Sequence, residues 1–178
     1  MGGKPLLRGL IGHNARSRPL VRDERGAALV EAAFVAMLLI SLLLGTVTAG
    51  IAYGRFHSLQ TTAREASRFG ATLPVTGTLD AWLDTARDVA KAAAIGDLDS
   101  GIPGQYICVA MVHPAGTTRR LVETGGTDAY SDADCFTDGR PSQEQRVQVQ
   151  VRRITNINAA VFSTDVTLQG SAAARFER

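Results

Sequence analysis

A single carboxylate stands near the start of a long apolar segment in this chain of 178 residues. Glu31 follows Gly26 by five residues, and the stretch from Ala32 to Gly54 carries no charge. A carboxylate is costly in hydrocarbon, so one in such a segment is a candidate functional group. Cleavage after Gly26 would make Ala27 the N-terminal residue and would leave Glu31 in the first turns of a helix. There the helix dipole and the new α-amino group would favour the negative charge of Glu31. The alternative is a carboxylate that simply lies at the membrane interface.

Other residues that could do chemistry are few and scattered. Asp132 and Asp134 have the spacing of the first two ligands of a calcium loop, but Phe136 stands where a third oxygen ligand belongs. This acidic loop is therefore expected to be solvated. The histidines have no paired metal-ligand spacing: His13, His57 and His113. We see no nucleophile elbow or phosphate-binding loop, and predict a protein that is not an enzyme, with no catalytic, metal or cofactor-binding residues.

The apolar segment has the length of a membrane span. As a helix, its uncharged residues 32–54 would extend about 34 Å, enough for a hydrocarbon core of about 30 Å. A buried core helix usually has a polar stripe, which Ser41, Thr46 and Thr48 do not form. The segment also exceeds the apolar region of about 7–15 residues in a secretory signal peptide. We therefore predict a single membrane span, with a core helix and a cleaved signal as the alternatives.

Charge is distributed unevenly along the chain. Residues 1–26 hold six basic and two acidic side chains, a formal charge of +4, whereas the whole chain carries +2. The remainder is therefore at −2, which argues against a nucleic-acid partner. The positive-inside bias predicts a cytoplasmic N-terminus and an extracytoplasmic C-terminal domain.

Several motifs flank or fill the apolar segment. They are Arg25-Gly26-Ala27, Val30-Glu31, Gly45, Gly50 and Gln60-Thr61-Thr62-Ala63-Arg64-Glu65-Ala66-Ser67-Arg68-Phe69-Gly70. Together they resemble the N-terminus of a type IV prepilin and, more specifically, the TadE-like family of tight-adherence (Tad, or Flp) pilus systems. The resemblance covers residues 22–71 and returns faintly at Ser171–Glu177.

The resemblance implies a minor pilin or pseudopilin that takes part in pilus assembly and adhesion. A prepilin peptidase would cleave between Gly26 and Ala27, and Glu31 would pair with the N-terminal amine of a neighbouring subunit. The implied partners are that peptidase, other pilins or pseudopilins, the Tad assembly platform and membrane lipid. The chain is far longer than a major Flp pilin, which argues against a bulk filament subunit. Two alternatives stay open: a pseudopilin of a type II secretion system, and a permanently anchored membrane protein with an extracytoplasmic binding domain.

The remaining pattern predicts an α+β fold. A basic leader (1–26) precedes a helix over 27–72 that is broken at Pro74, and an α+β domain follows over 73–178. The helix should bury the face that carries Phe56, Leu59, Ala63, Ala66 and Gly70. A second helix is expected over 80–95, stopped at Gly96 and with Trp82 in the core. Alternating segments over 105–112, 120–123, 146–152 and 166–176 predict three to four antiparallel strands.

The two cysteines are expected to form a disulfide. Cys108 lies in an expected strand and Cys135 in the expected loop 128–145. In an extracytoplasmic domain two cysteines are usually bonded, which would stabilise the fold by about 3–4 kcal/mol for a loop of this size. The alternative is that one of them is a buried free thiol.

Overall fold

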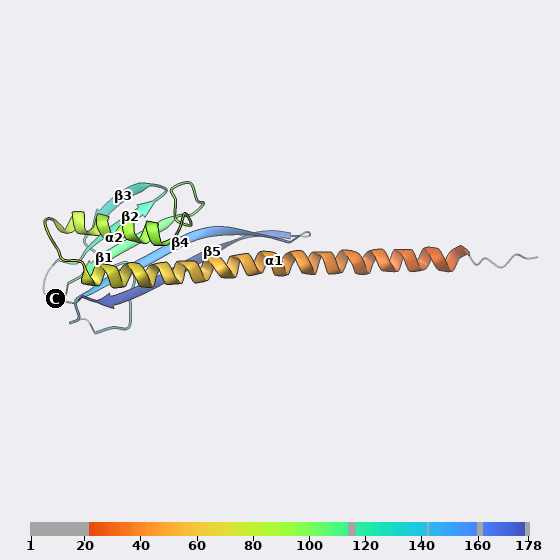
Figure 1. The fold of residues 1–178 in the computed structure, drawn as a ribbon, viewed down its shortest axis with the longest axis horizontal. Helices are drawn as coiled ribbons and strands as arrows, with labels where there is room; N and C mark the ends of the chain where they lie inside the picture. Colours follow the sequence, from red (N-terminus) through yellow and green to blue (C-terminus); the bar gives the residue numbers. More distant parts are fainter. Residues whose placement is uncertain (1–21, 114–116, 142, 160–161, 177–178) are drawn as a thin grey trace, which may run out of the picture. The chain divides into compact units, whose positions relative to one another are not determined.

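The computed structural model describes residues 22–113, 117–141, 143–159 and 162–176. These residues form two helices and five strands (Figure 1). Residues up to Leu39 and residues from Ile40 onward are two compact units, and each is described by itself. The α+β fold is confirmed, with five strands rather than three to four.

Helix α1 runs from Arg22 to Thr72. It begins before the predicted start at Ala27, because a glycine inside a helix, here Gly26, costs only about 1 kcal/mol. It ends two residues before Pro74, close to the predicted break, since a residue that precedes proline disfavours the helical conformation.

Helix α2 runs from Leu79 to Ala93, two residues short of the predicted end. Thr78 caps its N-terminus by accepting a hydrogen bond from the Ala81 amide at 3.3 Å. Beyond the helix, both Ile95 and Gly96 have positive φ, 48° and 83°, so the chain has already turned before the glycine. The inward face of α2 holds Trp82, Leu83, Ala86 and Ala90, which confirms the core position of Trp82.

The five strands form one antiparallel sheet in the order β3-β2-β1-β4-β5. Their bounds are β1 Tyr106–Val112, β2 Arg119–Thr124, β3 Thr127–Ser131, β4 Arg146–Ala159 and β5 Phe162–Arg175. The sequence located β1 and β2 to within a residue at each end. It predicted only the first half of β4 and missed the start of β5, because those parts of the two strands are polar and pair only with each other.

Strand β3 lies where a loop was expected. All its side chains except that of Ser131 are exposed, so it lacks the apolar alternation that marks a half-buried strand. The turn before it consists of Gly125 and Gly126, both with positive φ, as a two-residue hairpin turn requires. The Gly-Gly pair was the signal that could have revealed this edge strand.

The two faces of β1 are covered by different parts of the chain. Ile107, Val109 and Met111 belong to the hydrophobic core that the helices share with the sheet. Cys108 and Ala110 point to the other face and are equally buried. The disulfide from Cys108 brings the loop after β3 to this second face. The central strand is therefore buried on both sides, as its continuous apolar sequence indicates.

Candidate functional site

The residues predicted to act at the N-terminus lie together on α1, in the unit up to Leu39. Ala27 and Glu31 are four residues apart, so they occupy the same face of the helix. Both side chains are exposed. No other part of the described chain lies within 4 Å of a Cβ built on Gly26. The geometry leaves this junction accessible to another protein, and the roles of its residues stay predictions.

Most large apolar side chains between Leu29 and Ile51 on α1 are exposed. They include Leu29, Phe34, Met37, Leu38, Ile40, Leu42, Leu43, Val47 and Ile51, each at least half exposed. Among the described residues, α1 is the one helix long and apolar enough to cross a membrane, by length and composition. None of the residues in its most apolar 18-residue window is buried, unlike those of a soluble core helix. A single-pass membrane anchor is compatible with this surface.

The C-terminal part of α1 is buried against the sheet on the predicted face. Leu59, Ala63 and Ala66 are fully buried, and Phe56 packs against the core at the edge of this face. Gly70 also belongs to it, because a Cβ there would lie 3.1 Å from a methyl group of Val147. The small residues let the helix approach the sheet closely.

A second glycine, which sequence reasoning missed, lies directly against the backbone of α1. A Cβ built on Gly170 of β5 would lie 2.3 Å from the carbonyl oxygen of Leu59 and 2.9 Å from the amide nitrogen of Gln60. Glycine inside a strand often marks such close backbone contact, and this was the one available signal. The contact fixes how deeply the helix sits on β5.

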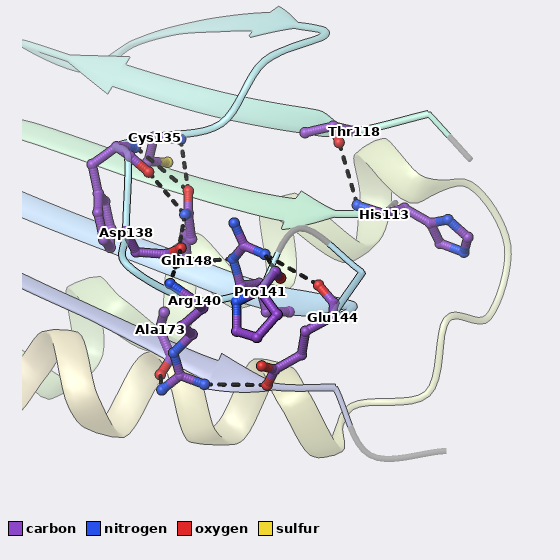
Figure 2. Close-up of polar contacts among 11 residues, drawn as sticks. His113, Thr118, Cys135, Asp138, Arg140, Pro141, Glu144, Gln148 and Ala173 are labelled. Atoms are coloured by element: carbon purple, nitrogen blue, oxygen red, sulfur yellow. Dashed lines mark hydrogen bonds and ion pairs between the residues drawn. The ribbon is translucent and has the colours of Figure 1, made fainter. Parts of the chain in front are cut away.

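The disulfide joins Cys108 on β1 to Cys135, with 5.8 Å between their Cα atoms. Figure 2 shows how Gln148, a fully buried residue of β4, points at the same loop. Its Oε1 accepts from the Cys135 amide at 3.0 Å, and its Nε2 donates to the Phe136 carbonyl at 2.9 Å. The loop is thus held by the covalent bond and by one buried amide side chain.

An ion pair completes the attachment of this loop. The Arg146 Nε donates to Asp138 at 2.8 Å, and both side chains are at most a tenth exposed. Gln148 donates to the same carboxylate at 2.9 Å. Burial by itself would raise the pKa of Asp138, but the Gln148 hydrogen bond and the Arg146 charge outweigh it and hold the pKa below its usual 3.8. The ionised carboxylate therefore stabilises the loop.

A second buried carboxylate, Glu123 of β2, connects α2 to the sheet. The Lys91 Nζ donates to it at 2.8 Å and the Gln105 Nε2 at 3.0 Å, while the Arg87 Nε lies 3.5 Å from its other oxygen. Only 2% of the Glu123 side chain is exposed, so a substrate could not reach it. This cluster positions α2 against the sheet.

Two of the polar residues set aside in the sequence, Asp132 and His57, have contacts of their own. Asp132 accepts from Arg119 at 3.0 Å, so it is engaged in an ion pair. His57 stacks edge-on against Tyr53, with ring centroids 4.4 Å apart. His13 lies outside the described residues. Within the described part of the chain, no three His, Cys, Asp or Glu side chains are grouped closely enough to hold a metal ion.

Comparison with known proteins identifies the N-terminal helix. Residues 26–68 match the family model described as TadE-like protein. The resemblance seen in the sequence is thereby confirmed: this segment of the chain is similar to the TadE-like family. The match lies entirely within α1 and includes Gly26, Ala27 and Glu31. No curated protein and no solved structure matches the chain.

Proposed function

We propose that this protein is a minor pilin or pseudopilin of a Tad pilus system, held in the cytoplasmic membrane by α1 until it is assembled. One observation carries the proposal: the TadE-like match coincides with a helix whose N-terminal half exposes an apolar surface. The N-terminus would be cytoplasmic, in keeping with the positive charge of residues 1–26. The disulfide-containing domain would be extracytoplasmic, where such bonds persist.

The role is structural and not catalytic. Apolar helices would pack side by side in the assembly, with the head domain outside. Its partners would be a prepilin peptidase, other pilins or pseudopilins and the Tad assembly platform. Assembly and adhesion would then depend on surfaces rather than on an active site.

Maturation is the first step that the proposal requires. Co-expression with a prepilin peptidase should shorten the chain by its first 26 residues and leave Ala27 as the N-terminus, read by mass spectrometry of the purified protein. Gly26→Leu should block the cleavage without disturbing the fold, because no described atom surrounds that position. Gly50→Leu is the matched control, since Gly50 lies on the same helix in equally open space. An intact N-terminus despite an active peptidase would contradict the proposal and favour a permanently anchored protein.

Glu31 would act after maturation. A lone carboxylate in hydrocarbon needs a positive partner, and the Ala27 amine of a neighbouring subunit would supply one. Glu31→Gln should therefore leave cleavage intact and abolish incorporation into pili, measured by immunoblotting of sheared filaments. Glu65→Gln changes an exposed glutamate farther along the same helix and serves as the control. Normal incorporation of the Glu31→Gln protein would refute the pairing role.

A further inference from the structure

The hairpin of β4 and β5 is longer than the rest of the sheet. The two strands pair from Arg146 with Arg175 to Ala159 with Phe162. Strand β1, by contrast, pairs with β4 only as far as Arg152. Seven further residues of β4 therefore continue as a two-stranded ribbon, about 23 Å long at about 3.3 Å per residue.

This ribbon follows α1 towards the apolar part of the helix, as Figure 1 shows. The Gln60 Nε2 donates to the Gln169 carbonyl at 3.3 Å. Farther along, the Thr48 Oγ1, which donates to the Leu44 carbonyl within the helix, lies 3.2 Å from the Asn158 carbonyl oxygen. Both contacts lie within the unit that begins at Ile40. The end of the ribbon is thus beside Thr48, inside the span predicted over residues 32–54.

The described end of the ribbon is polar. The Asn156 Nδ2 donates to Asp165 at 2.8 Å, and the Ser163 Oγ donates to Asn156 at 3.1 Å. These three side chains are exposed. An exposed carboxylate is costly in hydrocarbon, and the open edges of a two-stranded sheet do not occur there. The part of α1 beside this ribbon therefore cannot lie in the bilayer core.

We infer that α1 leaves the hydrocarbon near Thr48, about two turns before Gly54, and that the ribbon end rests on the phospholipid headgroups as a second membrane contact. The inference builds on the proposed anchoring role of α1. Residues 26–47 number 22 and extend about 33 Å as a helix, which still crosses a hydrocarbon core of about 30 Å.

Two residues of α1 just beyond Thr48 suit this boundary. Tyr53 is 65% exposed, and tyrosine is enriched where membrane meets water. Arg55 is the first charged residue after the apolar segment and would face the lipid phosphates. Both would lie in the headgroup layer beside the ribbon rather than at the outer edge of the hydrocarbon core.

Thiol labelling of the full chain in lipid nanodiscs tests the boundary. Single cysteines replace Met37, Ile51 and Phe69, which are all well exposed, while the native pair stays in its disulfide. The nanodiscs contain phosphatidylethanolamine and phosphatidylglycerol, and the probe is a membrane-impermeant maleimide. The thiolate reacts and needs water, so Ile51→Cys should label at close to the rate of Phe69→Cys, and Met37→Cys at least about tenfold more slowly.

The outcomes separate the inference from the proposal on which it rests. Slow labelling of both Ile51→Cys and Met37→Cys would overturn the early exit and leave the anchor intact. Fast labelling of Met37→Cys would mean that α1 is not in the membrane, so the anchoring role itself would fail.

A second measurement tests the lipid contact of the ribbon. An environment-sensitive fluorophore on Ser163→Cys should be quenched by headgroup spin-labelled lipid in the same nanodiscs. The matched position is Thr167→Cys, which is also exposed and lies about 13 Å farther along β5. Stronger quenching at residue 163 supports the contact. Equal quenching at the two positions, or none, would refute it.

Discussion

Replacing Gly170 by alanine should separate α1 from the sheet. The added Cβ would lie 2.3 Å from the Leu59 carbonyl oxygen and 2.5 Å from its carbon. Real Cβ atoms essentially never approach other atoms within 3.0 Å, so helix and strand must move apart by at least 0.7 Å, the difference between 3.0 and 2.3 Å. The obstacle is backbone, and no side chain can rotate to relieve it. We therefore expect the upper end of the overpacking range, about 3 kcal/mol of lost unfolding free energy.

Trp82, the one tryptophan of the chain, reports on this loss because it is buried in the same core. Urea unfolding of the full chain in detergent micelles should show its fluorescence midpoint lowered by about 1.5 M, for a slope of about 2 kcal/mol per M. Ser171→Ala puts an alanine at the next position of β5 and should change the midpoint little. If the Gly170→Ala variant and the wild type had the same urea midpoint, the close approach of Gly170 to the helix would be refuted.

Two further predictions concern the loop that covers the second face of β1. Replacing Cys108 and Cys135 together by alanine should lower the unfolding free energy by about 3.5 kcal/mol, the chain-entropy value for a separation of 27 residues; an unchanged urea midpoint would contradict this. Asp138→Asn should cost about 3 kcal/mol at pH 7, because it leaves the buried Arg146 without its counter-charge. The fold lowers the pKa of Asp138, so its contribution is present above about pH 4 and is lost as the pH falls through the folded-state pKa. Urea midpoints of the wild type and Asp138→Asn should therefore converge as the pH falls below about 4, and a constant difference would exclude this linkage.

The sequence revealed those features that depend on local pattern. The apolar run, the buried face of α1, the position of Trp82 and the strand β1 follow from periodicity, which responds directly to burial. The long ribbon and β3 did not follow from periodicity, because β3 is exposed and the ribbon is rich in polar residues, so their strands are stabilised by pairing rather than by apolar alternation. Gln148 also went unnoticed, because only the tertiary fold places the disulfide loop over its position in β4.

The candidate site was also predicted only in part from the sequence. Gly26, Ala27 and Glu31 were found from their spacing, and they fall within the segment that matches the TadE-like family. Gly170 could not be recognised as a contact point from its neighbours, because what it contacts is a helix more than 100 residues earlier in the chain. Close approach is a property of two segments at once, and a single sequence shows each of them separately.

The extent of the family match has a physical explanation in the surroundings of α1. The matched residues 26–68 pass through an exposed apolar stretch, a stretch beside the ribbon and a stretch buried against the sheet. Each imposes its own composition on the helix: leucine-rich in the first, threonine and glycine around Thr48, and alanine between charged residues after Leu59. A helix that must satisfy all three in order has little freedom in its sequence.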